Sequence, residues 1–240
     1  MDMSKVTTLM RNVLPLKYCG AVIVAAGNAS RMGGIDKVMA MLDGEPMIVR
    51  TVRTFQNCEA IKEIVIVTRE DLIVPITDLC KDFDKVRAVV PGGSSRQESV
   101  GMGLNALSGK VKLAAVQDGA RPLITETVID RTVRAAHSYG AAAPAIPVKD
   151  TIKVVKGGMV ESTPDRATLQ AVQTPQIFDM DLLKGALKNA ELTGAAVTDD
   201  CSAVELMGMK VKIVEGDERN IKVTTPMDLK IAEMLLEEMK

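Results

Sequence analysis

Aromatic side chains are scarce in this sequence of 240 residues, which has no tryptophan, two tyrosines and three phenylalanines. Apolar residues of all kinds still make up 47% of the chain, so aliphatic side chains and methionine must fill the core. A chain of this length buries a substantial core, either as one large α/β domain or as two small ones.

Histidine and cysteine, the usual ligands of zinc sites, are also few. The single histidine, His137, lies in a stretch patterned like a helix, which favours a structural role and removes most of the support for a Ser-His-Asp triad. The four cysteines are scattered and form no C-x-x-C pair. This spacing excludes neither a disulfide nor a metal site, but it is more typical of buried thiols in a cytoplasmic protein.

The chain has no excess of charge and no long apolar run. Thirty basic and 31 acidic residues give a net charge of −1, so no overall basic field recruits nucleic acid, and any anion must be bound locally. The apolar stretch at residues 20–27 is too short to span a membrane, and the one at 141–148 contains two prolines. We expect a cytoplasmic protein with neither a membrane nor a nucleic-acid partner, in which residues 1–17 are a leader of unknown order.

One stretch, residues 20–37, indicates a phosphate-binding site. An apolar run rich in β-branched residues ends at Gly27, and a polar, Gly-rich loop carrying Arg31 and then Lys37 follows it. Small residues at the end of a buried strand let backbone N–H groups approach a ligand, and two cations suit a nucleoside triphosphate. The loop matches neither G-x-x-x-x-G-K-[ST] nor G-x-G-x-x-G, so an ordinary strand-to-helix turn with surface charges is the alternative.

Apolar runs and amphipathic segments alternate along the chain, which predicts a doubly wound α/β fold with a parallel sheet. After residues 21–26, strands are predicted over 64–67, 86–90, 112–117, 141–148 and 211–214. Helices are predicted over 45–57, 71–82, 125–139, 180–192 and 199–207, and from about 96 and 226 onward. Residues 149–164 break the alternation and suggest a hairpin, with strands at 151–155 and 157–160.

Polar residues at the ends of the predicted strands are candidate ligand contacts. Ser94 or Ser95 is expected to cap the helix that follows. Asp118 ends a strand, where it can hold hydrated Mg²⁺, accept sugar hydroxyls or pair with Arg121. Thr198 can cap the helix predicted over 199–207. Lys222 lies between two apolar residues, so its side chain should point away from theirs.

Several short blocks together resemble a known family. The chain is similar to pyrimidine nucleotidyltransferases of the glycosyltransferase-A-like fold, and more closely to the 2-C-methyl-D-erythritol 4-phosphate cytidylyltransferase family. After residues 20–37, the matching blocks run in the family's order to the C-terminus: 91–93 with Arg96 and Ser99, 118–122, 147–151, 165–166, 173–176, 198–200 and 220–224.

The resemblance implies a Rossmann-like fold: a mostly parallel, twisted sheet with helices on both faces and a protruding β-arm. It implies a single cytidylyltransferase domain over residues 18–240, with a dimerisation arm at about 149–166. The implied reaction transfers CMP from CTP to 2-C-methyl-D-erythritol 4-phosphate and releases pyrophosphate. The partners are then CTP, a polyol phosphate and a second copy of the chain.

The resemblance also implies roles for individual residues. The catalytic residues are Arg31, Lys37, Lys222 and Arg166, the last acting across a dimer interface. The implied CTP contacts are Ala25, Ala26, Gly27, Arg31, Lys37, Gly93, Ser99 and Asp118. The implied contacts to the polyol phosphate are Asp118, Arg121, Thr151, Arg166, Thr198 and Lys222. Mg²⁺ is expected to bind mainly through the CTP phosphates, with its direct protein ligands left open.

Three other functions would use parts of the same pattern. Ribitol-5-phosphate cytidylyltransferases share the fold and the nucleotide chemistry, but residues 147–153 and 165–166 look more like the methylerythritol enzyme. A noncatalytic CTP-binding regulatory module would need the nucleotide loops but not both Arg166 and Lys222. The hypothesis of an NAD-dependent oxidoreductase is weakened because the G-x-G-x-x-G fingerprint is missing.

Overall fold

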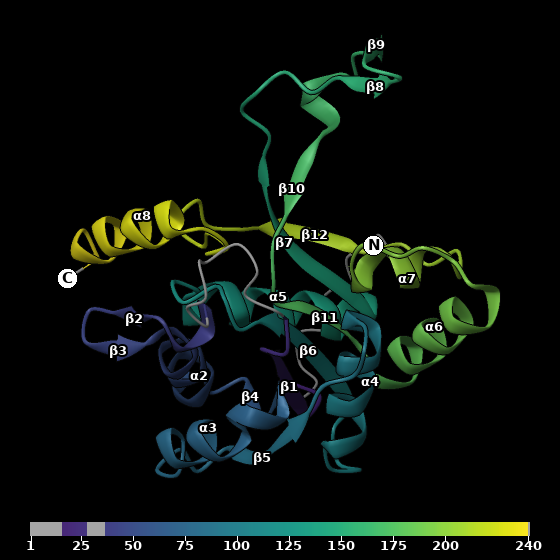
Figure 1. Ribbon diagram of the computed structural model, residues 1–240. Coiled ribbons are helices and arrows are strands. Elements are labelled where there is room, and N and C mark those ends of the chain that lie inside the picture. The colour runs from purple at the N-terminus through teal and green to yellow at the C-terminus, as the bar shows by residue number, and fades with distance from the viewer. Residues whose placement is uncertain (1–15, 28–36, 240) are drawn as a thin grey trace, which may run out of the picture.

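The computed structural model describes residues 16–27 and 37–239, and one twisted sheet runs through its centre (Figure 1). Four strands form a parallel half in the order β6-β1-β4-β5: β1 (Cys19–Val24), β4 (Ile61–Thr68), β5 (Val86–Pro91) and β6 (Leu113–Asp118). The other half is mixed. β11 (Gln176–Asp179) runs antiparallel between β6 and β7 (Ala141–Pro147), which also pairs with β10 (Gln170–Val172) and, in parallel, with β12 (Lys212–Glu215).

Helices cover both faces of this sheet (Figure 1). On one face lie α2 (Met47–Asn57), α3 (Ile73–Leu79) and α5 (Glu126–Tyr139), and on the other lie α4 (Arg96–Ala106), α6 (Met180–Thr193) and α7 (Asp200–Glu205). The alternation of side chains along β1 divides the core accordingly: Ala21 and Ile23 pack with the first set, and Val22 packs with the second. The predicted fold class is confirmed.

Smaller elements complete the molecule. The 3-10 helix η1 (Lys37–Met39) leads into the short hairpin β2 (Met41–Leu42) and β3 (Glu45–Pro46). The C-terminal helix α8 (Pro226–Glu237) covers this hairpin through a third apolar cluster that contains Leu42, Val223 and Ala232. None of the helices in the described ranges is both long and apolar enough to cross a membrane.

The hairpin of β8 (Val154–Lys156) and β9 (Met159–Ser162) protrudes from the sheet as an arm (Figure 1). Every residue in both strands is exposed, including Val155 at 56% and Met159 at 75%. The protruding arm is therefore confirmed, although its strands lie about two residues further along the chain than predicted. A two-stranded hairpin with no buried side chain lacks a core of its own.

Some predicted boundaries were wrong, for local reasons. The helix predicted over residues 45–57 starts at Met47, because β3 pairs with β2 instead. The helix predicted over 71–82 is a 3-10 turn, η2 (Glu70–Leu72), followed by α3. Strands β10 and β11 were not predicted. They are short, and only their place beside β6 and β7 makes them strands.

The cysteines and the histidine lie in places that fit the structural roles predicted for them. All four cysteines, Cys19, Cys58, Cys80 and Cys201, are buried free thiols. Burial raises the pKa of the Cys80 thiol to about 11. The Nδ1 atom of His137 accepts the backbone N–H of Lys17 at 3.4 Å.

Candidate active site

A cavity of about 430 Å³ opens where the carboxyl ends of β1, β4, β5 and β6 meet. Its walls come from the segment after β1, from Thr68 at the end of β4, from the turn after β5, from Asp118 and from Lys222. Ligands of open α/β sheets bind at this edge. The cavity therefore lies at the carboxyl end of β1, where the stretch 20–37 predicted a nucleotide site.

The turn after β5, residues 92–95, forms one wall and is fixed by its own hydrogen bonds. Gly93 N–H donates to the Ser99 hydroxyl at 3.1 Å, and that hydroxyl donates to the Ser95 carbonyl at 2.9 Å. Ser99 therefore lines the cavity and also holds the turn in shape. Of the two predicted caps, Ser95 is the one that caps α4, since its side chain accepts the Glu98 N–H.

Ser94 lies on the same wall and is held by Glu98 of α4. Its hydroxyl and its backbone N–H donate to Glu98 Oε2 at 2.8 and 2.7 Å. These bonds, first the one from the hydroxyl, lower the pKa of Glu98. The turn thus presents an ionised carboxylate beside its backbone.

Gly92 lets the turn approach the end of β1. An added Cβ at Gly92 would overlap the Cβ of Ala26 and lie 2.9 Å from the Ser99 hydroxyl oxygen. Any larger residue must therefore push the turn and the β1 end apart.

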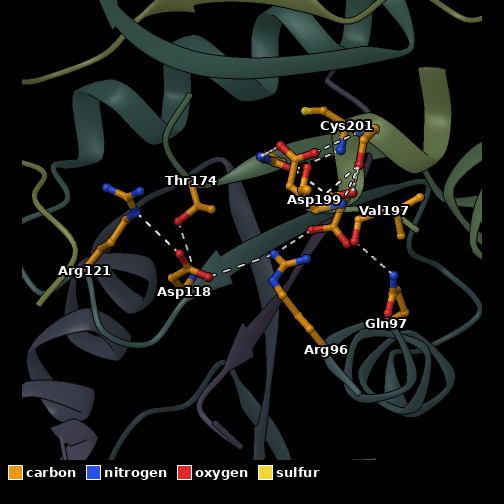
Figure 2. Close-up of polar contacts among 12 residues, drawn as sticks. Arg96, Gln97, Asp118, Arg121, Thr174, Val197, Asp199 and Cys201 are labelled. Carbon is orange, nitrogen blue, oxygen red and sulfur yellow. Dashed lines mark hydrogen bonds and ion pairs between the residues drawn. The ribbon is translucent and has the colours of Figure 1, made fainter. Parts of the chain in front are cut away.

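Asp118 lies at the rim of the cavity, among three cations. Its Oδ2 lies 2.8 Å from Lys222 Nζ and 3.5 Å from Arg121 Nε, and its Oδ1 lies 3.9 Å from Arg96 Nη2 (Figure 2 draws both arginines). Burial by itself raises the pKa of Asp118, but Lys222, Arg96 and Arg121 outweigh it and hold the pKa below its ordinary value. The group is a carboxylate at neutral pH.

Arg96 also pairs with a second carboxylate, Asp200, at 2.7 Å from Nη2 to Oδ2. The Asp200 side chain is completely buried, and this burial raises its pKa even though Arg96 favours the charged form. Arg96 thus lies between Asp118 and Asp200. Neither Arg96 nor Asp200 was among the predicted site residues. Their only signal in the sequence was their presence in two of the matching blocks.

The loop that carries Lys222 is held by buried amides. Gln173 Nε2 donates to the carbonyl of Asp217 at 2.8 Å, and Asn220 Nδ2 donates to the carbonyl of Thr174 at 3.0 Å. The Asn220 carbonyl accepts Arg121 Nη1. The prediction for Lys222 was correct, because Val223 is buried while Lys222 points to Asp118.

The block at 173–176 forms hydrogen bonds to Asp118 and to the start of α7. The Thr174 hydroxyl accepts the Asp118 N–H at 3.1 Å (Figure 2). The Gln176 Oε1 accepts the N–H groups of Asp200 and Cys201, both at 3.0 Å. In the sequence, these residues stood out only as one of the matching blocks.

The predicted cap of α7 was wrong. Asp199, not Thr198, is the N-cap, and it forms a capping box with Ser202. Both residue types are good caps, so the choice depends on Ser202 lying three residues after Asp199 and on Gln176, which donates to Asp199 Oδ2 at 2.7 Å. Thr198 is exposed, and its hydroxyl is not used for capping.

The structure brings most of the predicted CTP contacts together. Those that line the cavity are Ala25, Ala26, Gly27, Gly93, Ser99 and Asp118, and Lys222 lines it with them. Arg121 contacts Asp118 beside it. Arg31 lies outside the described residues, and of Lys37 only the backbone is described, as the start of η1 next to Val38 in the cavity wall.

Two predicted contacts to the polyol phosphate lie elsewhere. Thr151 and Arg166 are exposed at the arm and do not line the cavity of their own chain. Arg166 Nη1 donates to the carbonyl of Lys149 at 2.8 Å. Within one chain, the arm and the cavity are therefore separate.

Metal ligands are sparse in the described part of the chain, which has no group of three or more histidine, cysteine or carboxylate side chains placed to hold an ion. Asp118, the buried carboxylate in the cavity wall, already has Lys222 and Arg121 beside it. A divalent cation here would depend on oxygen ligands from a bound phosphate and from water.

Comparison with known proteins gives a consistent result. The family model described as 2-C-methyl-D-erythritol 4-phosphate cytidylyltransferase matches residues 19–238. Curated proteins of that name are similar to the chain. The one from Caldanaerobacter subterraneus is 42% identical over 225 residues, covering 90% of this chain and 97% of that protein. The one from Geobacillus kaustophilus is 46% identical over 219 residues, covering 90% and 96%.

Solved structures agree with the sequence relatives. The crystal structure of 4-diphosphocytidyl-2C-methyl-D-erythritol synthase from Anaerococcus prevotii superposes with a TM-score of 0.84 at 31% identity, covering 92% of this chain and 99% of that one. The 2-C-methyl-D-erythritol 4-phosphate cytidylyltransferase from Thermus thermophilus gives a TM-score of 0.77 at 30% identity, covering 92% and 99%.

Replacing Gly92 by alanine should weaken CTP binding about tenfold or more, because the new methyl group separates the turn from the β1 end on which backbone contacts depend. Calorimetric titration with CTP measures the effect. Gly109→Ala is the matched control, since a Cβ at Gly109 meets nothing within 4 Å. Equal CTP affinity in the two variants would contradict the close-approach argument.

Asp118 should make stability depend on pH in the acid range. Because its folded pKa is lowered, its stabilising effect is complete above the ordinary value of 3.8 and is lost as the pH falls through the folded value. Urea unfolding at a series of acid pH values should therefore show a smaller loss of stability on acidification for Asp118→Asn than for the wild type. Parallel curves would show that the surrounding cations do not hold the carboxylate in its charged form.

Proposed function

The chain belongs to the 2-C-methyl-D-erythritol 4-phosphate cytidylyltransferase family, and from this premise we propose how its cavity performs the family's reaction. The protein is a nucleotidyltransferase. It transfers CMP from CTP to 2-C-methyl-D-erythritol 4-phosphate, giving 4-diphosphocytidyl-2-C-methyl-D-erythritol and pyrophosphate in the non-mevalonate synthesis of isoprenoid precursors.

The reaction needs positioning more than proton transfer. An oxygen of the acceptor phosphate attacks the α-phosphorus of CTP in line, a new P–O bond forms, and the bond to the β-phosphate breaks as pyrophosphate leaves. A phosphate monoester loses its second proton near pH ~6, so the nucleophile is already ionised at neutral pH. A chain with one histidine, placed away from the cavity wall, suits such a reaction.

The nucleotide half of the site is proposed to lie between the β1 end and the turn after β5. Backbone groups of Ala25 to Gly27 and of Gly93 then contact the nucleotide, and Ser99 keeps the turn in shape. Arg31 and Lys37 are proposed to bind the triphosphate and to stabilise the charge that develops on the α-phosphoryl and leaving groups.

The acceptor half is proposed to lie around Asp118. The observation that carries this assignment is Lys222 Nζ, which lies 2.8 Å from Asp118 at the cavity rim and supplies a cation where two phosphates must meet. Asp118 and Arg121 are proposed to contact the polyol phosphate with Lys222. Thr198 has a hydroxyl that is not needed for the helix cap, which supports its role as a further contact.

The remaining acceptor contacts are proposed to come from a second copy of the chain. Arg166 and Thr151 are exposed and do not line the cavity of their own chain, which supports their use in a partner's site. The exposed apolar residues of the arm, such as Val155 and Met159, support burial against a partner. We infer a homodimer of single cytidylyltransferase domains, residues 18–240, joined by the arm at about 149–166, with 1–17 as a leader.

Mg²⁺ is proposed to bind mainly through the CTP phosphates. The residues present fit this role, because the cations beside Asp118 leave the metal to depend on phosphate and water oxygens. When bound, Mg²⁺ neutralises charge on the phosphates and thereby eases the departure of pyrophosphate. The four buried free thiols support a cytoplasmic location.

The substrate assignment is tested by pyrophosphate release from CTP and Mg²⁺, with 2-C-methyl-D-erythritol 4-phosphate and ribitol 5-phosphate offered separately. We expect release with the first acceptor alone. Release with ribitol 5-phosphate alone would retain the nucleotide site and overturn the acceptor assignment. CTP binding without release from either acceptor would indicate a regulatory module.

Catalysis across the interface is tested by mixing two inactive variants. Arg166→Ala and Lys37→Ala should each lower kcat by roughly 10²-fold or more, because each removes a cation that positions or stabilises phosphate. In random hybrid dimers, one site of each mixed pair keeps both residues, so about a quarter of wild-type activity should return. Verified heterodimers that remain inactive would rule out a contribution from the partner chain.

A further inference from the structure

Asp200 is a buried carboxylate that the local structure does not require. It is the first residue of α7, and its side chain has no exposed surface. The helix is capped by Asp199 and Ser202, and the Gln176 side chain accepts the Asp200 backbone N–H. The cap does not use the Asp200 side chain, and a buried carboxylate carries a desolvation cost.

The partner of Asp200 is Arg96, a cation in the wall of the cavity. Arg96 is the first residue of α4, directly after the turn at 92–95, and it lines the cavity itself. Its Nη2 lies 2.7 Å from Asp200 Oδ2 and 3.9 Å from Asp118 Oδ1 (Figure 2 labels Arg96 and Asp118). A second contact joins the same two segments: Gln97 Nε2, in α4, donates to the carbonyl of Val197, just before α7, at 3.4 Å. The turn is thereby joined to the segment around α7.

Arg96 therefore lies closer to the carboxylate of Asp200 than to that of Asp118. Asp200 holds the guanidinium closely and so keeps it from closing on Asp118, which has Lys222 and Arg121 beside it. If Asp200 lost its charge, Arg96 would move toward Asp118 and displace the start of α4. A shift of about 1 Å at such a site costs as much as 10²-fold in rate or binding.

We propose that Asp200 is a positioning residue for the nucleotide: through Arg96 it fixes the turn at 92–95 and keeps Asp118 for the acceptor side. This inference rests on the proposed function for its ligand, CTP. Asp200 itself touches no substrate, and it acts only through Arg96.

The test is a double-mutant cycle of Asp200→Asn, Arg96→Gln and both together, with the CTP dissociation constant measured by calorimetry on the full chain. Asp200→Asn should weaken CTP binding about tenfold, and it should weaken binding no further when Arg96 is already glutamine, because the two residues act as one unit. In turnover assays the KM for CTP and the KM for the acceptor should both rise, because Arg96 then no longer holds the turn and moves onto Asp118.

Val204→Ala is the matched control for a loosened helix, because Val204 is fully buried in α7 and belongs to an apolar cluster. It should lower the melting temperature without changing CTP affinity. The proposal is overturned if Asp200→Asn binds CTP within about twofold of wild type, if the two effects simply add, or if Val204→Ala weakens CTP binding as much.

Failure of the proposed function gives a different result. If the wild type binds CTP but transfers CMP to neither acceptor, the binding cycle still decides the role of Asp200. If the wild type does not bind CTP at all, both proposals fall.

Discussion

A buried carboxylate at the end of β6 is the constraint on which the site depends. Asp118 is 8% exposed, so its charge is stable only with cations close by. Those cations come from the start of α4, from the turn after β6 and from the loop before α8: Arg96, Arg121 and Lys222. Satisfying one carboxylate therefore joins three separate segments of the chain, and the cations that neutralise it are the groups an anionic substrate needs.

Irregular backbone around this carboxylate is held by amide side chains rather than by regular secondary structure. Gln173 and Asn220 tie the loop that carries Lys222 to the strand edge, and Gln176 holds the start of α7. Buried polar groups are costly when unpaired, so such amides specify a single loop conformation. A site for in-line transfer between two phosphates needs this rigidity, because positioning supplies much of the rate.

The chemistry explains why so few conventional catalytic side chains are present. The attacking phosphate needs no general base, and the thiols are buried with raised pKa values at Cys19, Cys58, Cys80 and Cys201. In the proposed mechanism, cationic side chains and backbone groups position the phosphates and stabilise their charge. The proposed contribution of a second chain is also a cation, Arg166. The arm that carries it is exposed and has little core of its own, so Arg166 reaches a site only when the arm packs against another copy.

The sequence by itself determined the parallel half of the sheet, the hairpin after residue 149 and the orientation of Lys222, because each follows from the spacing of apolar residues over a few positions. It also placed Ala25, Gly93 and Asp118 at strand ends that share one edge. Only the tertiary structure decided that β11 enters the sheet antiparallel, that Asp199 rather than Thr198 caps α7, and that Arg96 is shared by Asp118 and Asp200. These outcomes depend on partners far apart in the chain, such as Arg121 and the Asn220 carbonyl 99 residues away, and local patterns carry no information about which distant partner a buried group will meet.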